Sequence, residues 1–256
     1  MLFARTVSDT RLIFVRCLRQ TLRSKVAVVF GVMQPLLYLL LFGPLLSRLV
    51  EVRGFGAGNA WQVFVPGVLI QLALFGAGFV GFGLIADLRS GVVERLRVTP
   101  VSRTALLLGR VLRDAFVLAV QAVMLLAAGL ALGLRAPVGG IVVGLVFVVS
   151  LAVSAASLSY VLALRTRSED AFAPLLSTVT LPLMLLSGIL LPMSMAPGWL
   201  DAVSRLTPFR YVVDAARAAF LGDYATAAVA EGALVTVVLL VVSVALGARR
   251  FRGENA

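Results

Sequence analysis

Residues 138–164 read VGGIVVGLVFVVSLAVSAASLSYVLAL and contain no charged side chain. A helix rises about 1.5 Å per residue, so about 20 apolar residues cross the roughly 30 Å hydrocarbon core of a bilayer. This run is long enough to do so. It predicts a membrane-spanning helix and sets the fold class of the chain.

Working outward from this run, the sequence holds five more of the same kind. Of the 256 residues, 61% are hydrophobic and 14% are charged, against about 45–50% apolar and about 25% charged in soluble domains. The run after Lys25 is expected to be a retained first span and not a cleaved signal peptide. We predict an all-α membrane protein with one transmembrane domain, 1–256, and six spans at about 26–47, 61–85, 108–134, 138–164, 173–193 and 227–247.

Basic residues set the expected orientation. Six spans place both termini on one side, and with the termini inside, 17 of the 23 Lys and Arg residues fall in cytoplasmic segments. Because cytoplasmic loops retain Lys and Arg, we predict a multi-pass protein of the inner or plasma membrane with both termini in the cytoplasm. The net charge of +11 then reflects topology, and no nucleic-acid partner is expected.

Several kinds of chemistry lack the residues that they need. The chain has no His and a single cysteine, Cys17, so imidazole catalysis, internal disulfides and Cys- or His-based metal sites are not expected. A phosphate-binding loop needs GxxxxGK followed by Ser or Thr, and the only lysine, Lys25, stands outside such a pattern. We therefore expect no catalytic residue, cofactor or metal in this chain.

Titratable side chains inside the membrane would indicate ion coupling. The predicted spans carry none in their middles, because Asp87, Asp114 and Glu231 stand at or near span ends. An ion-coupled secondary transporter is therefore an alternative without a buried carboxylate to support it.

Two segments outside the spans are expected to be helical on the cytoplasmic side. Residues 1–25 predict an interfacial helix, whose basic face holds Arg5, Arg16, Arg19 and Arg23 and whose apolar face holds Phe3, Val7, Phe14, Leu18 and Leu22. The joint 87–104 contains ERLRVTPVSRT at 94–104. Its short helix is expected to end at Thr99-Pro100, with Thr99 as the N-cap of the next helix. On that helix Arg110 and Asp114 are four residues apart and could pair near the membrane interface.

Two stripes within the membrane could face a substrate. The second span carries Gln71, Phe75, Phe79 and Phe82, and the fifth carries Ser177, Thr180, Met184 and Ser187. Aromatic, polar and thioether surfaces suit a bulky amphipathic ligand, but ordinary helix packing gives similar stripes. The isolated Gln34 and Gln121 allow the same two interpretations.

The segment 194–225 between the fifth and sixth spans is too long for a simple loop. Trp199 stands where interfacial aromatic residues settle. Thr207-Pro208 is expected to open a helix over 209–221 that ends at Gly222. We predict a re-entrant or interfacial helical segment on the external side.

Four features of the chain occur together. They are the basic N-terminal helix, ERLRVTPVSR at 94–103 with LLGR at 107–110, LSG at 186–188 with Pro192 and PGWL at 197–200, and TPFRYVVDAAR at 207–217. In these features the chain resembles the permease subunits of ATP-binding-cassette type-2 exporters, in particular the daunorubicin-resistance-like branch. The similarity runs through essentially the whole chain, with Thr207 where the family often has Asn.

What the resemblance implies is a drug or lipid exporter that works as a dimer of permeases, homomeric or heteromeric, with separate cytoplasmic ATPase subunits that hold ATP and Mg²⁺. The short cytoplasmic helix would be a coupling helix, with Glu94, Arg95, Arg97 and Arg103 as ATPase contacts. Spans two and five of both protomers would line the pathway, which makes the two stripes substrate candidates. Lipids and polysaccharides are other cargoes of the same family.

Overall fold

The computed structural model describes residues 2–23, 31, 33, 36–41, 44, 60–92, 95, 102–189 and 193–253. Every regular element in this part of the chain is a helix, which confirms the all-α class. The first predicted span, 26–47, lies mostly outside the described residues. Five described segments are long and apolar enough to cross a membrane, namely Trp61–Arg89, Thr104–Ala131, Val138–Thr166, Glu169–Leu186 and Ala227–Phe251.

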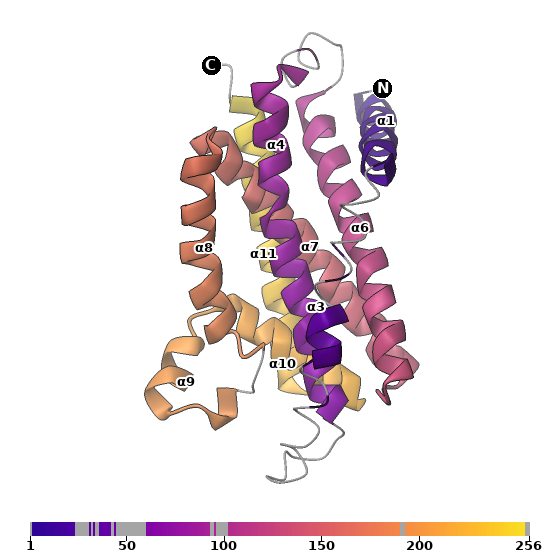
Figure 1. Ribbon diagram of the computed structural model, residues 1–256, viewed down its shortest axis with the longest axis vertical. Coiled ribbons are helices and arrows are strands. Elements are labelled where there is room, and N and C mark those ends of the chain that lie inside the picture. Colours follow the sequence, from indigo (N-terminus) through magenta and orange to yellow (C-terminus); the bar gives the residue numbers. More distant parts are fainter. Residues whose placement is uncertain are drawn as a thin grey trace.

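The long helices stand side by side in a bundle (Figure 1), and α7 (Val138–Thr166) lies in its middle. Helix α8 (Glu169–Leu186) stands at the edge of the bundle, with a limited contact to α3 and α7. The helices that pack on α7 are α3 (Ala60–Gly78), α4 (Val80–Arg89), α6 (Arg103–Ala131), α10 (Pro208–Leu221) and α11 (Ala227–Gly253).

The two ends of the bundle differ in charge and in content. In Figure 1 the N-terminal helix α1 (Leu2–Arg23) and the C-terminus of α11 lie at the same end, together with the end of α4. We call this the basic end, because Arg89 and Arg165 lie in the last turns of α4 and α7, and Arg249 lies near the end of α11. The other end holds η1 (Met193–Met195), α9 (Gly198–Ser204) and α10. Termini at one end agree with an even number of spans.

The entry into α6 differs from the prediction. Ser102 is the N-cap of α6, and its hydroxyl accepts a hydrogen bond from the Ala105 N–H at 3.2 Å. The cap therefore falls three residues later than the predicted Thr99, which itself lies outside the described residues. The sequence offers hydroxyls at both positions, but a tertiary contact selects Ser102, because its N–H donates to the Asp9 carboxylate of α1 at 3.3 Å.

Span boundaries elsewhere also differ from the predicted ones, most clearly in the second and fifth spans. The second span is interrupted at Phe79, between α3 and α4, and continues to Arg89. The fifth ends at Leu186, well before the predicted residue 193. Gly188 has a φ of 70°, a left-handed conformation that glycine adopts without strain and that ends a helix.

Helix α10 spans Pro208–Leu221, the stretch for which the sequence predicts a helix, but its surroundings differ from those of a helix lying in the outer leaflet. Val212, Val213 and Phe220 are fully buried. A Cβ added to Gly140 would collide with the Ala219 carbonyl, and one added to Gly144 would collide with the Phe220 ring. The small residues of α7 thus let α10 approach closely, so the apolar face of α10 is covered by protein.

Candidate functional site

The predicted stripe on the second span forms a continuous row of rings. The centroids of Phe75 and Phe79 are 6.3 Å apart, and Phe79 stacks on Phe82 at 5.9 Å with an interplanar angle of 13°. Phe82 then meets Phe172 of α8 edge to face at 4.8 Å. Aromatic pairs at such distances attract each other beyond simple burial. The row therefore connects the second and fifth spans within one protomer.

The helix break at Phe79 is held by a residue of the central helix. The Ser159 hydroxyl donates to the Gly78 carbonyl at 2.5 Å and accepts from the Gly81 N–H at 3.0 Å. These backbone groups flank the break, and a serine can serve as donor and acceptor at once. Ser159 of α7 thus fixes the backbone geometry at this break. The Phe79 side chain at the break is 48% exposed.

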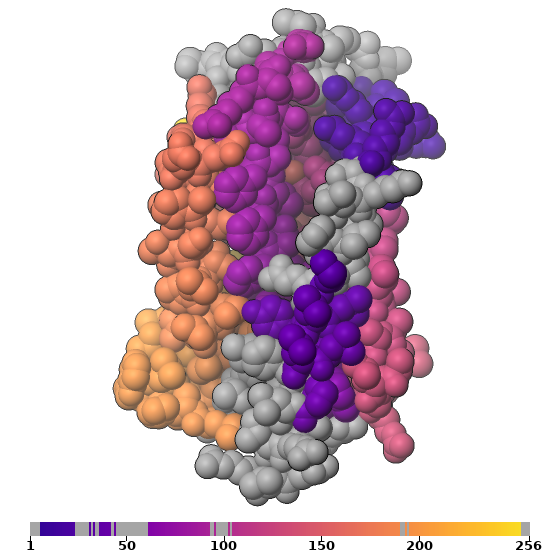
Figure 2. Space-filling view, viewed as in Figure 1, coloured from indigo at the N-terminus to yellow at the C-terminus, as the bar shows by residue number. Residues whose placement is uncertain are grey.

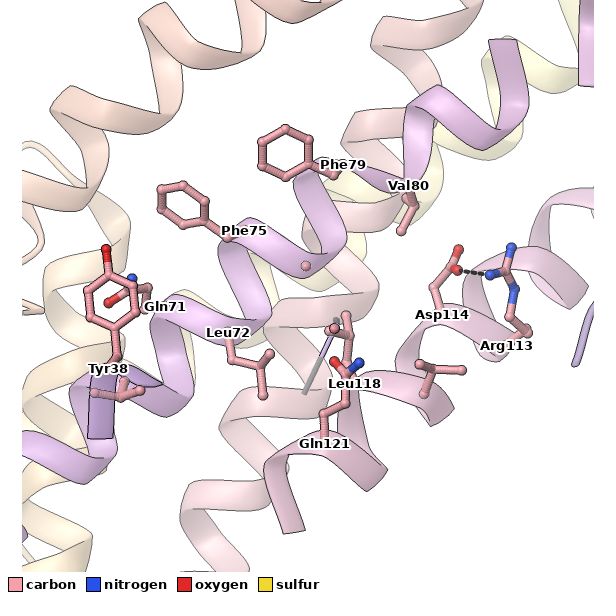
Figure 3. A pocket seen from close by; sticks show the side chains of 14 residues that line it. Tyr38, Gln71, Leu72, Phe75, Phe79, Val80, Arg113, Asp114, Leu118 and Gln121 are labelled. Carbon is pink, nitrogen blue, oxygen red and sulfur yellow. Dashed lines mark ion pairs between the residues drawn. The ribbon is translucent and has the colours of Figure 1, made fainter. Parts of the chain in front are cut away.

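A cavity of about 350 Å³ lies beside this stripe, between α3 and α6 (Figure 3). Three predicted substrate candidates line it, Gln71 and Phe75 from α3 and Phe79 from the break after α3, and α6 contributes Gln121. Gln71 is 5% exposed, and its Oε1 has no hydrogen-bond partner among the described residues. Three of the four predicted residues of this stripe therefore share one cavity, while Phe82 packs toward α8.

Charged groups lie at one end of this cavity, inside the third span. Arg113 and Asp114 line it and pair at 3.0 Å (Figure 3), and the Tyr160 hydroxyl of α7 donates to Asp114. The predicted Arg110–Asp114 pair is wrong, because Arg110 pairs with Asp87 of α4 at 2.7 Å. Asp114 is also 3% exposed and deep in α6, so the expectation of spans without buried charge is wrong for this helix.

The predicted stripe on the fifth span does not reach the same cavity. Thr180 lines a second cavity of about 410 Å³ on the other side of α3, between α3, α7 and α8. Ser177 is exposed, and Met184 packs partly against the core. Ser187 is fully buried and donates to the Leu183 carbonyl of its own helix. Within one protomer the two stripes therefore face different spaces.

The predicted coupling segment is described at two of its four candidate residues. The Arg95 N–H donates to the Gly91 carbonyl at 3.1 Å, which makes one helical turn, and the Arg95 side chain is exposed. Arg103 is the first residue of α6. Glu94 and Arg97 lie outside the described residues.

Helix α1 docks directly on α6. A Cβ added to Gly109 would lie 2.7 Å from the Ile13 Cβ and 3.0 Å from the Thr10 carbonyl oxygen, so the two helices cross in contact here. Farther along, Arg113 donates to the Thr21 hydroxyl at 3.2 Å. Residues 2–23 form one helix, and its face against α6 holds Thr10, Ile13 and Thr21. The predicted apolar residue Phe14 also packs there, edge to face on Phe116 of α6 at 5.9 Å. The predicted apolar residues Val7 and Leu22 stay largely exposed.

At the opposite end, two arginines of α10 organise the external segment. Arg217 is 7% exposed, and its guanidinium donates to the carbonyls of Val63, Gly188 and Ile189 at 2.8–3.1 Å. It thus joins α10 to the start of α3 and to the chain after α8. Burial lowers the pKa of Arg217 to about 10, so it stays charged at neutral pH.

The second arginine, Arg210, pairs with Asp201 of α9 at 2.6 Å. Arg205 and Arg210 donate to this carboxylate and lower the pKa of Asp201. Thr207 occupies the N-cap position of α10, but its hydroxyl donates back to the Ser204 carbonyl at 2.6 Å and does not cap the helix. Trp199 is 70% exposed, as a residue of an interfacial belt would be.

Sequence reasoning missed the residues whose partners are distant in the chain. Tyr160 and Ser159 stand in an apolar run that reads as an ordinary span, and only the fold brings them to Asp114 and to the break at Phe79. A signal for the charged cluster was present. Three charged residues, Arg110, Arg113 and Asp114, stand within five positions of a helix that continues as an apolar run.

Comparison with known proteins places this architecture in a family. Residues 8–221 match the family described as the ABC-2 type transporter. A putative transport permease (ycf38) of Cyanophora paradoxa is 28% identical over 200 residues, which cover 77% of this chain and 69% of that relative. A daunorubicin resistance ABC transporter permease of Streptomyces coeruleorubidus is 27% identical over 233 residues, covering 88% and 79%.

A probable doxorubicin resistance ABC transporter permease of Mycobacterium tuberculosis is 26% identical over 219 residues, covering 84% of this chain and 78% of the relative. The family match covers most of the chain, including α1 from residue 8 onward, the segment before α6, and α10. The resemblance noted from the sequence is therefore confirmed, and this chain belongs to the ABC-2 type transporter family.

Proposed function

We propose that this chain is the membrane-spanning subunit of an ATP-driven exporter that moves an amphipathic or hydrophobic compound out of the cytoplasm. The observation that carries the proposal is the cavity between α3 and α6, because its aromatic and amide lining suits such a compound. Two relatives are named as permeases of daunorubicin and doxorubicin resistance, which supports a drug-like cargo. A cavity of about 350 Å³ also suits a small molecule better than a polysaccharide chain.

The energy would come from separate ATPase subunits that bind ATP and Mg²⁺ and dock at the basic end. The proposed contacts are Glu94, Arg95, Arg97 and Arg103. The last of these begins α6, the same helix that carries Arg113, Asp114 and Gln121 into the cavity. A push on the coupling segment would therefore act on a wall of the cavity through one rigid helix, and ATP binding would bias the permease between two conformations.

The remaining parts of the assembly follow from the same proposal. A second permease protomer, identical or similar, would complete the transporter. The complex would lie in the inner or plasma membrane, with the basic end and both termini in the cytoplasm. The exposed Trp199 and the α9–α10 corner would then face the external side.

Transport in inverted membrane vesicles tests the function. Vesicles that hold the chain with its ATPase subunit should take up daunorubicin when ATP is added, and uptake should stop with a non-hydrolysable analogue. Vesicles with the ATPase alone are the control. Uptake that needs an ion gradient and no ATP would contradict the proposal.

A charge reversal tests the coupling assignment. The double variant Glu94→Arg with Arg95→Glu keeps the net charge of the protein. Each of the two exchanged side chains would then face a residue of like charge on the ATPase. We expect transport to be lost while the protein still reaches the membrane, measured by vesicle uptake and by immunoblotting. The matched control is Arg250→Glu on α11, exposed at the same end. Normal uptake and ATPase co-purification in the double variant would refute the assignment.

Ion-coupled secondary transport is the second candidate, and Asp114 is the observation that favours it, because a buried carboxylate within a span is often functional. However, Asp114 is held by Arg113 and Tyr160, which favours a fixed structural pair. Collapse of the proton gradient in ATP-supplied vesicles decides between the two, since only the ion-coupled mechanism would stop.

A further inference from the structure

We propose that a groove between α1, α6 and α7 binds an anionic phospholipid of the surrounding bilayer, with an acyl chain along α6 and the headgroup phosphate at Arg11. The groove has a volume of about 710 Å³. Its α6 residues lie on the helix face opposite to the cavity shared with α3. The inference therefore concerns a lipid that stays bound to the protein, and it does not depend on the proposed function.

The wall of the groove is apolar and suits a hydrocarbon chain. Val7, Leu112 and Phe116 line it and are 46–59% exposed. The Thr10 hydroxyl is already bonded, because it donates to the Thr6 carbonyl at 2.7 Å. Contiguous exposed apolar surface of this kind marks contact with a partner or a membrane. Since α6 is itself long and apolar enough to cross a membrane, the neighbour at this groove is lipid.

The length of the groove matches one leaflet of the bilayer. Its lining on α6 runs from Leu108 to Ala119, a distance of about 16 Å at 1.5 Å per residue. Half of the roughly 30 Å hydrocarbon core is about 15 Å. Ala119 lies close to the middle of the apolar segment Thr104–Ala131, and α1 lies beside α6 at the basic end (Figure 1). A chain along this wall would thus reach from the level of α1 to the centre of the bilayer.

The charges on α1 suit an anionic headgroup. Arg11 is exposed and lines the groove. It also lines the adjoining surface of α1, whose other basic residues are Arg16, Arg19 and Arg23. None of these four guanidinium groups forms an ion pair with a residue that the structure describes. The only acidic residue of α1, Asp9, accepts from the Ser102 N–H at the start of α6. The surface beside the groove is therefore positive and open to an anion.

Arg11 is the residue that joins the apolar groove to this basic surface. It stands four positions after Val7 and three before Phe14, and all three residues line the groove. A long arginine side chain can lay its apolar stem along such a wall and keep its guanidinium at the level of the headgroups. The planar guanidinium also matches the geometry of a phosphate. Its position on an otherwise apolar face is thus explained by one amphipathic ligand.

Native mass spectrometry of the full-length chain, purified in detergent and freed of lipid, tests the headgroup contact because it resolves each bound lipid. The probes are dioleoyl phosphatidylglycerol, which is anionic, and dioleoyl phosphatidylcholine, which has no net charge. We expect the first phosphatidylglycerol to bind about fivefold more tightly, the contribution of one arginine near an anionic lipid. Arg11→Gln should lose this preference and should still fold, because the side chain is exposed.

The matched control is Arg250→Gln on α11, an exposed arginine at the same end of the bundle. It removes the same charge away from the groove and should keep the preference. An equal loss in both variants would mean that net charge alone attracts the lipid. Equal binding of the two lipids to wild type would mean that the groove holds ordinary bilayer lipid. Either result would overturn the proposal.

The acyl chain is tested separately from the headgroup. Ala119→Phe fills the deep end of the groove and should weaken binding of both lipids. Glycerol 1-phosphate carries the phosphate without the chains, so it should not displace phosphatidylglycerol at equal concentration; displacement would indicate a site for free anions and not for lipid. Unchanged lipid binding in Ala119→Phe would also refute the proposal. If that variant lost a dimer in the same spectra, the groove would be an interface between two copies.

Discussion

A single hydroxyl, that of Ser159, stabilises the break in the second span. Replacing it with alanine would leave the Gly78 carbonyl and the Gly81 N–H without this partner in a buried region. We expect Ser159→Ala to lower the free energy of unfolding by about 1–3 kcal/mol, measured as a lower Tm of the purified chain in detergent. Ser157→Ala is the matched control, because the Ser157 hydroxyl bonds only to the Val153 carbonyl of its own helix. Equal Tm values for the two variants would contradict the role of Ser159.

Arg217 stabilises the opposite end through its forked geometry. Its guanidinium reaches the carbonyls of three separate chain segments, a pattern that the single ammonium of lysine cannot reproduce. We expect Arg217→Lys to cost about 3 kcal/mol of stability although the charge is kept. The control is Arg205→Lys, because the Arg205 side chain is 67% exposed and pairs with Asp201. If Arg205→Lys lowered Tm as much as Arg217→Lys, the loss would be a general effect of replacing arginine by lysine and not of the three carbonyl contacts of Arg217.

Individual residues of the site show what could and could not be predicted from the sequence. The candidates Gln71, Phe75 and Phe79 could be predicted, because helical spacing places them on one face. Their cavity could not, since its other wall comes from a helix about 40 residues later in the chain. The expectation that no carboxylate is buried within a span failed at Asp114 for a related reason. The sequence shows its distance from a predicted span end, but its burial comes from the packing of α6 against other helices, among them α7 with Tyr160, which no local pattern reveals.

Among the elements, the crossing of α1 and α6 gives a sharp prediction. An added methyl group at Gly109 has no room against Ile13, so Gly109→Ala should displace α1 from α6. Cys17 lies on α1, partly buried, and is the only cysteine. We expect its rate of labelling by a maleimide to rise several-fold in Gly109→Ala. Gly83→Ala is the control, because nothing lies within 4 Å of the Cβ it would add. An unchanged rate in Gly109→Ala would mean that α1 tolerates the methyl group without moving.

Element boundaries show which signals are reliable. The apolar runs predicted the positions of the described spans because each must cover the same thickness of hydrocarbon. Their ends were less certain. Hydroxyl residues at positions 99 and 102 can both cap a helix, and the choice of Ser102 depends on Asp9, far away in the sequence. The close fit of α10 on Gly140 and Gly144 also needed the fold, since a helix in the leaflet and a helix on protein share one amphipathic pattern.

On the scale of the whole molecule, the two ends of the bundle have different roles in the proposed exporter. The basic end holds α1, Arg95 and the start of α6, while the Arg217 clamp holds the other end together. The cavity lies along α6, which runs from one end toward the other (Figure 2 shows α6 along one flank of the molecule). A movement that starts at the coupling segment can therefore reach the cavity while the clamped end stays fixed.

The orientation of these ends is the last prediction, and it can be tested with single cysteines. If the basic end is cytoplasmic, a membrane-impermeant maleimide added to intact cells should label Trp199→Cys in a Cys17→Ser background, because residue 199 is exposed at the α10 end. The native Cys17 should react only after the membrane is permeabilised. Gly109→Ala, which should make Cys17 more reactive, separates sidedness from burial: its Cys17 should still be protected in intact cells. Labelling of Cys17 from outside, with Trp199→Cys protected, would invert the protein and would place the proposed ATPase contacts on the side without ATP.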